Sequence, residues 1–464
     1  MLRPPSKGRT STQPFVANFR RLFGAHTVSN LGDGIGLVAY PWLASTLTRD
    51  PVLISGVLIA QRLPWLLFSL PVGVVVDRMD RRNLMVGADA FRAALTAIVA
   101  VAVLRLQADL PSPDLIASVV EPDGIPNRLL LFAALLATLF LLGIGEVIHD
   151  TAAMTILPQI VDRSDLPSAN GTLSSAEQAA NLFFGPPLGA LLLSGAFVLP
   201  FLVDASSFAL SAAILLTLTL KFERHDDMTT STDNLPGRFR RELIGGYRAL
   251  RSDRHVTLFA VVTTVMNLTA GMIFSIMVFF AQDVLKAGPG QFSTLTVGSA
   301  AGSVAGGLLA AKLAKGLGLG LVLRTAALAM GLSLVALGFT ASWYVAAILL
   351  ASYGLWLIVW AANTTSFRQA VTANEVLGRV NGVYRFFTYG AIPVGALLSG
   401  LIVAVVETGQ TRETALRTPV LIAGTVQLLV SLAAAPRLNS RLLERARLAA
   451  QHTSGVQGSD IDQV

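Results

Sequence analysis

The chain has 464 residues, of which 53% are hydrophobic and only 14% are charged, and its mean hydropathy is +0.63. This composition excludes a soluble protein, in which about 25% of the residues would be charged. The absence of cysteine excludes disulfides, thiolate metal sites and cysteine nucleophiles. The five histidines are scattered, so neither a metal site nor a cofactor is expected. Long unbroken apolar segments favour helices over a barrel and predict an all-α membrane protein.

The positions of the apolar segments predict twelve membrane-spanning helices, since each crossing needs about 20 residues. A polar stretch, 221–255, follows the sixth span and is interpreted as a linker between two six-helix halves, 22–220 and 256–436. Residues 1–21 and 437–464 are predicted to be tails. The spans are placed near 22–47, 52–76, 84–106, 129–157, 168–194, 197–220, 256–284, 292–314, 319–341, 343–367, 376–406 and 418–436.

The distribution of Lys and Arg predicts how these spans are oriented. Most Lys and Arg residues lie in the two tails, the linker and the loops on the same side of the membrane, and few lie on the opposite side. The positive-inside rule therefore places both termini and the linker in the cytoplasm, in a multi-pass protein of the cell membrane. The same rule accounts for the net charge of +7 without a nucleic-acid partner.

The first predicted span carries an acidic residue, Asp33, near the middle of the membrane. Ionisable groups are costly at this depth, so each is a candidate functional residue. Asp33 is a candidate proton-coupling residue, because desolvation disfavours the charged form of a carboxylate and allows it to bind a proton near neutral pH. A structural role, as the ion-pair partner of Arg62 or Arg92 in the next two spans, is equally consistent with the sequence.

The fourth and fifth predicted spans carry polar stripes. Glu146, His149 and Asp150 fall at positions i, i+3 and i+4, which lie on one helical face. Glu177 belongs to a similar stripe in the fifth span. These faces are expected to line an internal cavity, with Glu146 and Glu177 as proton-coupling candidates and His149 and Asp150 as substrate candidates. Hydrogen bonding between helices and simple solvation are the structural alternatives.

Three arginines within predicted spans, Arg62, Arg92 and Arg385, require acidic partners or an anionic substrate. Arg385 in the eleventh span is expected to face the central cavity, with Asn381 one turn away. Asp204 in the sixth span is a further candidate, but the sequence does not identify its partner.

The fifth and eleventh predicted spans contain similar sequences. Pro187-Leu-Gly-Ala-Leu-Leu-Leu-Ser-Gly195 matches Pro393-Val-Gly-Ala-Leu-Leu-Ser-Gly400, and an Asn-Gly pair precedes each. A separation of six spans predicts two repeated halves with the substrate bound between them, as in alternating-access transporters. The alternative is that proline and small residues recur wherever helices pack closely.

The loop between the second and third predicted spans reads Gly73-Val-Val-Val-Asp77-Arg78-Met-Asp80-Arg81-Arg82. It resembles the Gly-x-x-x-Asp-Arg-x-Gly-Arg-Arg signature of the major facilitator superfamily, and the resemblance extends over nearly the whole chain. It implies a twelve-helix transporter, not an enzyme, in which the loop latches the two halves together on the cytoplasmic side. A basic loop that only sets the topology is the alternative.

Asp80 stands where the superfamily signature has its second glycine. This form of the loop resembles the branch that contains macrolide-efflux and enterobactin-exporter proteins, which implies drug:proton antiport. In the fifth span, Gly185-Pro186-Pro187-Leu-Gly189 resembles the core of the antiporters' glycine-proline motif. Proline removes a backbone hydrogen bond and glycine permits close approach, so this helix is expected to bend and to pack tightly.

These features together predict a secondary active transporter that exports amphipathic small molecules, such as drugs or siderophores, in exchange for protons, and that acts as a monomer in the bilayer. Thr172 and Asn181 replace glycines of the longer antiporter motif, so an importer or facilitator is the alternative. Sodium could replace the proton as the coupling ion. A membrane sensor or enzyme is a third possibility, although the sequence contains neither His-Glu-x-x-His nor a phosphate-binding loop.

Overall fold

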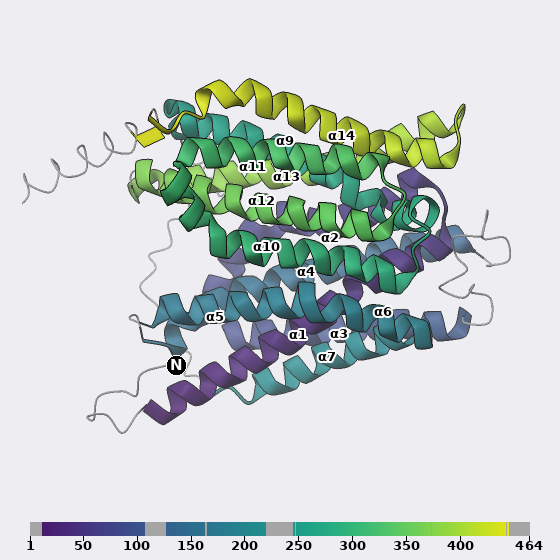
Figure 1. Ribbon diagram of the computed structural model, residues 1–464. Coiled ribbons are helices and arrows are strands. Elements are labelled where there is room, and N and C mark those ends of the chain that lie inside the picture. The colour runs from purple at the N-terminus through teal and green to yellow at the C-terminus, as the bar shows by residue number, and fades with distance from the viewer. Residues whose placement is uncertain are drawn as a thin grey trace, which may run out of the picture. The chain divides into compact units, whose positions relative to one another are not determined.

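The structure is a computed structural model of the chain, and its described part is built from helices (Figure 1). The all-α class predicted from the composition is confirmed. Most of the predicted linker and large parts of both predicted tails lie outside the described residues. The described residues are 12–106, 127–162, 165–219, 245, 247–372, 374–441, 443 and 444.

The helices follow the predicted apolar segments closely. Two π-helical turns interrupt them: η2 joins α5 to α6, and η3 extends α9. The first group comprises α1 (Thr12–Leu47), α2 (Pro51–Arg78), α3 (Arg81–Leu106), α4 (Arg128–Ile160), α5 (Leu166–Gln178), η2 (Ala179–Phe184), α6 (Gly185–Gly195) and α7 (Leu199–Leu216). The second comprises α9 (Arg254–Phe279), η3 (Phe280–Val284), α10 (Pro289–Leu317), α11 (Leu319–Phe339), α12 (Trp343–Val371), α13 (Asn374–Glu407), α14 (Arg412–Ala434) and the short 3₁₀ helix η4 (Ala435–Arg437).

Side-chain caps define several helix starts. Asp253 accepts hydrogen bonds from the backbone N–H groups of His255 and Val256 at the start of α9. Asp80 accepts one from the backbone N–H of Asn83 at 2.9 Å, at the start of α3. Such caps satisfy N–H groups that have no partner within the helix. The departure of Asp80 from the superfamily signature therefore has a local structural explanation.

Ten helices of the described part are long and apolar enough to cross a membrane. Two of the twelve predicted spans, 22–47 and 168–194, are not among them, so the count of twelve remains a prediction. Polar residues interrupt α1, among them His26 and Asp33. Polar residues such as Glu177 and Asn181 interrupt the second segment, in which η2 joins helices of 13 and 11 residues.

Large apolar side chains cover the outside of the helices. Ile98, Leu308 and Phe339 are 64%, 72% and 73% exposed. Exposed apolar area on this scale is unfavourable in water but suits a helix that is surrounded by lipid. The exposed apolar side chains thus agree with the membrane protein that the composition predicts.

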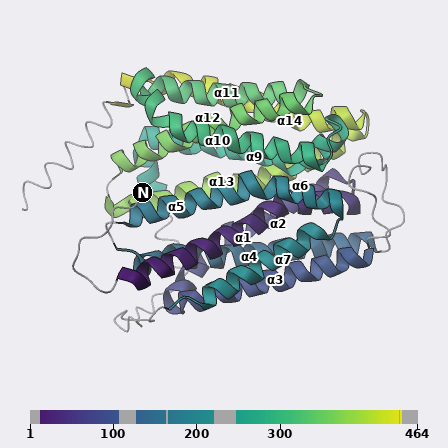
Figure 2. The same ribbon diagram turned by 60° about the horizontal axis from the view of Figure 1, so that its bottom comes forward.

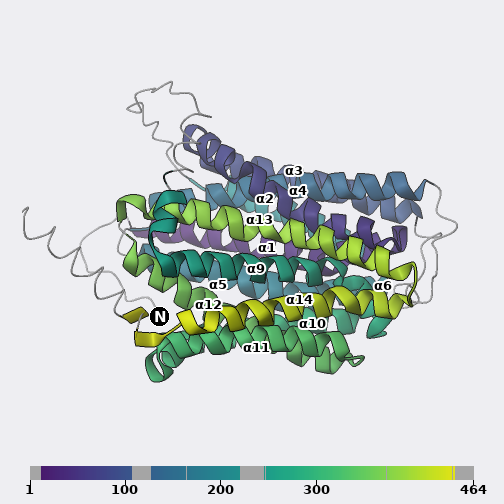
Figure 3. The ribbon, with the colours of Figure 1, turned by 90° about the horizontal axis from the view of Figure 1, so that it is seen from above.

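The chain forms two compact units. Within unit 1, which contains most of α1 to α7, α3 packs along α7 (Figure 2). Within unit 2, which contains α9 to α14, α10 packs on α12, and α11 packs on α14 (Figure 3). Residues 44–62, from the end of α1 to the middle of α2, belong to unit 2.

Glycines allow α1 and α6 to approach closely in unit 1. A Cβ atom added to Gly185 would lie 2.4 Å from the Cα of Gly34, and one added to Gly189 would lie 2.7 Å from the carbonyl oxygen of Ile35. A methyl group cannot fit at either distance, so only glycine is compatible with this backbone contact. The turn η2 ends just before Pro186, as expected because proline cannot donate the regular helical hydrogen bond.

The same contact occurs between α9 and α13 in unit 2. A Cβ atom added to Gly395 would lie 1.9 Å from the carbonyl oxygen of Leu268, and one added to Gly271 would lie 2.2 Å from that of Ile392. Gly189 and Gly395 occupy equivalent positions in the two similar sequences, and they contact α1 and α9 respectively. The sequence similarity thus coincides with a repeated packing arrangement.

This packing predicts that Gly395→Ala destabilises the protein, because the new methyl group collides with the backbone of α9. Overpacking of this kind costs about 1–3 kcal/mol, and the thermal unfolding midpoint of the purified protein in detergent should fall. Gly382→Ala on the same helix is the matched control, because a Cβ atom there has open space within 4 Å. Equal midpoints for the two variants would contradict the prediction.

Candidate functional site

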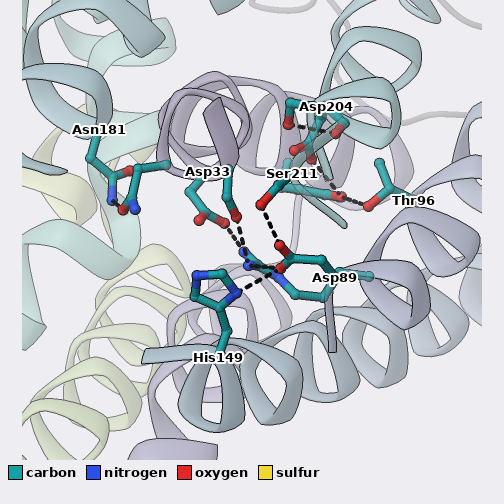
Figure 4. A network of polar contacts seen from close by, with 12 residues as sticks. Asp33, Asp89, Thr96, His149, Asn181, Asp204 and Ser211 are labelled. Carbon is teal, nitrogen blue, oxygen red and sulfur yellow. Dashed lines mark hydrogen bonds and ion pairs between the residues drawn. The ribbon is translucent and has the colours of Figure 1, made fainter. Parts of the chain in front are cut away.

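A network of buried charges lies inside unit 1, centred on Arg92 of α3 (Figure 4). The Arg92 guanidinium forms an ion pair with Asp33 of α1 and donates a hydrogen bond to the Ser29 hydroxyl at 3.2 Å. The Arg92 side chain is 3% exposed, whereas that of Asp33 is 26% exposed. Of the two partners that the sequence offered for Asp33, the structure selects Arg92.

Asp89, one turn before Arg92, extends the network to two further helices. Its carboxylate lies 3.5 Å from the Arg92 guanidinium and 3.0 Å from Nδ1 of His149 on α4. It also accepts a 2.5 Å hydrogen bond from the Ser211 hydroxyl on α7 (Figure 4). A charge taken out of water needs such partners, because an isolated buried ion is strongly destabilising.

The surroundings of Arg92 fit a guanidinium closely. Its Cζ lies 3.9 Å from the ring centroid of Phe208 on α7, a cation–π contact. On the side of α4, a Cβ atom added to Gly145 would lie 2.7 Å from Cγ of Arg92. Gly145 therefore leaves the space that the arginine side chain occupies.

A second acid, Asp204 of α7, lies near this network and is 2% exposed. Tyr40 of α1 donates a 3.4 Å hydrogen bond to it and also lies 3.4 Å from the Thr96 hydroxyl of α3. Tyr40 is therefore the partner of Asp204 that the sequence did not identify. These contacts connect α1, α3 and α7.

Polar contacts also join α1 to α5 and the following η2. Nε2 of His26 lies 3.8 Å from a carboxylate oxygen of Glu177. One turn later along α1, Asn30 accepts a 3.2 Å hydrogen bond from Asn181 (Figure 4). The predicted polar stripe of the fifth span therefore faces α1.

The structure brings only some of the predicted site residues together. Asp33, Arg92 and His149 belong to one network, and Glu146 and Asp150 are partly buried on the same face of α4. Arg62 is exposed and lies in unit 2.

The predicted site residues of the eleventh span lie on α13 of unit 2. Asn381 accepts a 2.8 Å hydrogen bond from Arg368 of α12. Arg385 is exposed, with its guanidinium 5.7 Å from the Tyr389 ring centroid. The expectation that Arg385 faces a central cavity remains a prediction.

The predicted cytoplasmic latch is described in part. Arg82 donates a 2.6 Å hydrogen bond to the backbone carbonyl of Leu216 at the end of α7. Gly73 and Arg81 are partly buried. The side chains of Asp77 and Arg78 lie outside the described residues, so the latch remains a prediction.

Sequence reasoning missed the roles of His26, Tyr40, Asp89 and Ser211. Asp89 could have been found, because it precedes Arg92 by three residues and shares its helical face. The other three carry no local signal, since their partners lie on helices that are distant in sequence.

Unit 2 contains a separate charge cluster. Asp283 of η3 accepts hydrogen bonds from Arg49, which follows α1, and from Arg412 of α14, the latter at 2.7 Å. Arg412 also pairs with Glu407 at 2.8 Å, and Arg49 donates to the Gln282 side chain at 2.7 Å. The side chains of Asp283 and Arg49 are 9% and 10% exposed.

Membrane-length helices with paired charges in the interior define a class of protein, the polytopic membrane transporters. The family of transmembrane secretion effectors matches residues 10–455. The chain therefore belongs to this family of major facilitator superfamily transporters, and it is not an enzyme. The superfamily membership predicted from the loop motif is confirmed.

Efflux proteins are among the relatives of the chain. Macrolide efflux protein A of Streptococcus pyogenes is 22% identical over 385 residues, covering 82% of this chain and 88% of that protein. The multidrug efflux pump Tap of Mycobacterium tuberculosis is 28% identical over 379 residues, covering 80% and 83%. The predicted resemblance to the macrolide-efflux branch is confirmed.

Solved transporter structures share the fold at low sequence identity. A bacterial homolog of the human lysosomal transporter Spinster has a TM-score of 0.67 and 14% identity, covering 96% of this chain and 99% of that one. The nucleoside transporter NupG has a TM-score of 0.65 and 13% identity, covering 91% and 98%. These likenesses concern the fold alone.

Proposed function

We propose that the chain exports amphipathic small molecules across the cell membrane in exchange for protons. Two six-helix halves, twelve spans in all, would alternate access to a substrate site, with both termini and the linker in the cytoplasm and a single chain as the working unit. The efflux proteins among its relatives support export, and their names support drug-like substrates. The proton coupling rests on a separate observation.

That observation is the asymmetry of the Asp33–Arg92 pair. Arg92 is almost fully buried and keeps contacts to Asp89 and Ser29, whereas Asp33 is about one quarter exposed. Asp33 can therefore take up a proton and leave the pair while Arg92 remains compensated by Asp89. A carboxylate that exchanges an ion-pair partner for a proton is what an antiporter requires.

Glu146 and Glu177 remain secondary candidates for coupling. Glu146 is partly buried on α4, and Glu177 is about one third exposed beside His26. Asp33 forms a described ion pair with the buried Arg92 guanidinium, and Glu177 faces His26 instead. Asp33 is therefore the first choice.

An importer or facilitator is the second candidate function, favoured by the departures at Thr172 and Asn181 from the antiporter motif. Both residues are polar, and Asn181 forms a hydrogen bond with Asn30 where a glycine would leave only backbone. The α1–α6 contact through Gly185 and Gly189 is nevertheless retained. Because these glycines belong to the sequence that resembles the antiporters' glycine-proline motif, the contact favours export.

Everted membrane vesicles test the proposal. In these vesicles the cytoplasmic face points outward, so an exporter should accumulate a macrolide or a fluorescent amphipathic dye when the interior is acidified. Accumulation should stop when nigericin collapses the pH gradient and should persist in sodium-free buffer. Equilibration without accumulation would indicate a facilitator, and dependence on sodium would replace the proton as the coupling ion.

A further inference from the structure

A cluster of nitrogen and oxygen atoms in unit 1 is not used by the proposed transport mechanism. His26 of α1 and His149 and Asp150 of α4 each place one potential ligand atom within 4.8 Å of the other two. The two imidazole rings are stacked, with centroids 6.1 Å apart and an angle of 14° between their planes. The sequence places His149 and Asp150 on one helical face but gives no indication that His26 lies beside them.

Each imidazole has one nitrogen beside a carboxylate and one without a partner. Nδ1 of His149 faces Asp89 at 3.0 Å, and Nε2 of His26 faces Glu177 at 3.8 Å. Within the described part of the chain, Nδ1 of His26 and both ring nitrogens of His149 have no hydrogen-bond partner, although Nδ1 of His149 lies within ion-pair distance of Asp89. The two side chains are only 1% and 8% exposed, so these nitrogens are shielded from water as well.

A carboxylate beside the second ring nitrogen is the usual arrangement around metal-binding histidines. The carboxylate fixes the orientation and tautomer of the ring and leaves the other nitrogen free to bind the ion. Asp89 is itself held by Ser211 and Arg92. A buried nitrogen without a partner is costly, and a bound ion would remove that cost at both histidines.

We propose that His26, His149 and Asp150 form a binding site for a divalent transition-metal ion of the Zn²⁺ type. Two imidazoles and one carboxylate suit Zn²⁺ or Co²⁺, whereas Ca²⁺ and Mg²⁺ require oxygen ligands. Ligand atoms around a tetrahedral ion lie about 3.4 Å apart. Side-chain rotations that bring the atoms up to about 1.4 Å closer complete the site and leave one position open for water or substrate.

A cleft of about 520 Å³ opens at the surface of unit 1. It is lined by Phe23, one turn before His26 on α1, and by Ala176, the residue that precedes Glu177. Glu177 is itself 36% exposed. Its carboxylate, 3.8 Å from Nε2 of His26, is therefore accessible to cations. The remaining lining residues are Ser168, Gly171, Thr172 and Ser175.

Metal titration of the purified full-length protein tests the site, with an affinity tag that contains no histidine. Isothermal titration calorimetry with Zn²⁺ should show one saturable site per chain, and Zn²⁺ should raise the thermal unfolding midpoint. His26→Gln and His149→Gln should each weaken binding by at least about tenfold. His255→Gln is the matched control, because His255 also lies 3.8 Å from an aspartate, Asp253, but in unit 2.

Loss of Zn²⁺ binding in the two variants with full binding in His255→Gln would establish the site. Absence of saturable binding to the wild type, or unchanged binding when both histidines are replaced, would overturn it. The absorption spectrum of Co²⁺ added to the wild-type protein tests the site even if the variants fail to fold. Intense bands of tetrahedral Co²⁺ support the site, and the weak spectrum of hydrated Co²⁺ contradicts it.

Discussion

Asp33→Asn is expected to abolish gradient-driven accumulation of substrate in everted vesicles. An amide at this position cannot release a proton, so the transport cycle loses its link to the pH gradient. Arg92 keeps its contact with Asp89, so the fold and the movement of the halves should survive. Exchange of labelled for unlabelled substrate, which needs no net proton movement, should therefore continue in the variant.

The comparison of accumulation with exchange separates coupling from general damage. Loss of both activities would mean that Asp33 has a structural role, as the partner that Arg92 needs. Retention of gradient-driven accumulation would exclude Asp33 as the coupling carboxylate. Glu413→Gln is a suitable control, because Glu413 is 55% exposed and its only described ion pair is with Arg417.

Asp283→Ala is expected to cause a large loss of stability. Asp283 lies between two guanidiniums, those of Arg49 and Arg412, and its own side chain is 9% exposed. Removal of one member of a buried ion pair costs about 3–5 kcal/mol, because the remaining charge stays buried without compensation. Both arginines also lie near the Phe279 ring, at 4.8 Å or less, so their positive charges would remain close together.

The thermal unfolding midpoint in detergent measures this loss. Glu413→Ala on α14 provides the comparison, since the exposed Glu413–Arg417 pair is worth about 0–1 kcal/mol. Asp283→Ala should lower the midpoint several times more than Glu413→Ala. Similar midpoints for the two variants would show that water or Glu407 compensates the arginines when Asp283 is absent.

The sequence predicted half of the candidate site. It identified Asp33, Arg92, His149 and Asp204, because a charge within an apolar segment is conspicuous wherever it pairs. It gave two possible partners for Asp33 and none for Asp204. Tyr40 and Ser211 resemble many other hydroxyl-bearing residues in the chain, so only their positions in the structure reveal that they hydrogen-bond to buried acids.

The sequence also predicted more spans than the structure supports by length and apolarity. The segment 168–194 carries polar residues such as Glu177 and Asn181, and its regular helix gives way to a π-helical turn at Ala179–Phe184. Proline at 186 predicts a bend, but the exact backbone there depends on the contact between Gly185 and Gly34. A contact between helices 150 residues apart leaves no local trace.

The sequence by itself determined the environment, the fold class and the family, because hydropathy and the loop from Gly73 to Arg82 are properties of contiguous residues. Tertiary structure decided which charged side chains form ion pairs. His149 belongs to a polar stripe that the sequence shows, but His26 is unremarkable in the sequence, and only the structure reveals that their rings stack. Helix packing brings together side chains whose spacing along the chain carries no signal, and both the ion-pair network and the proposed metal site arise in this way.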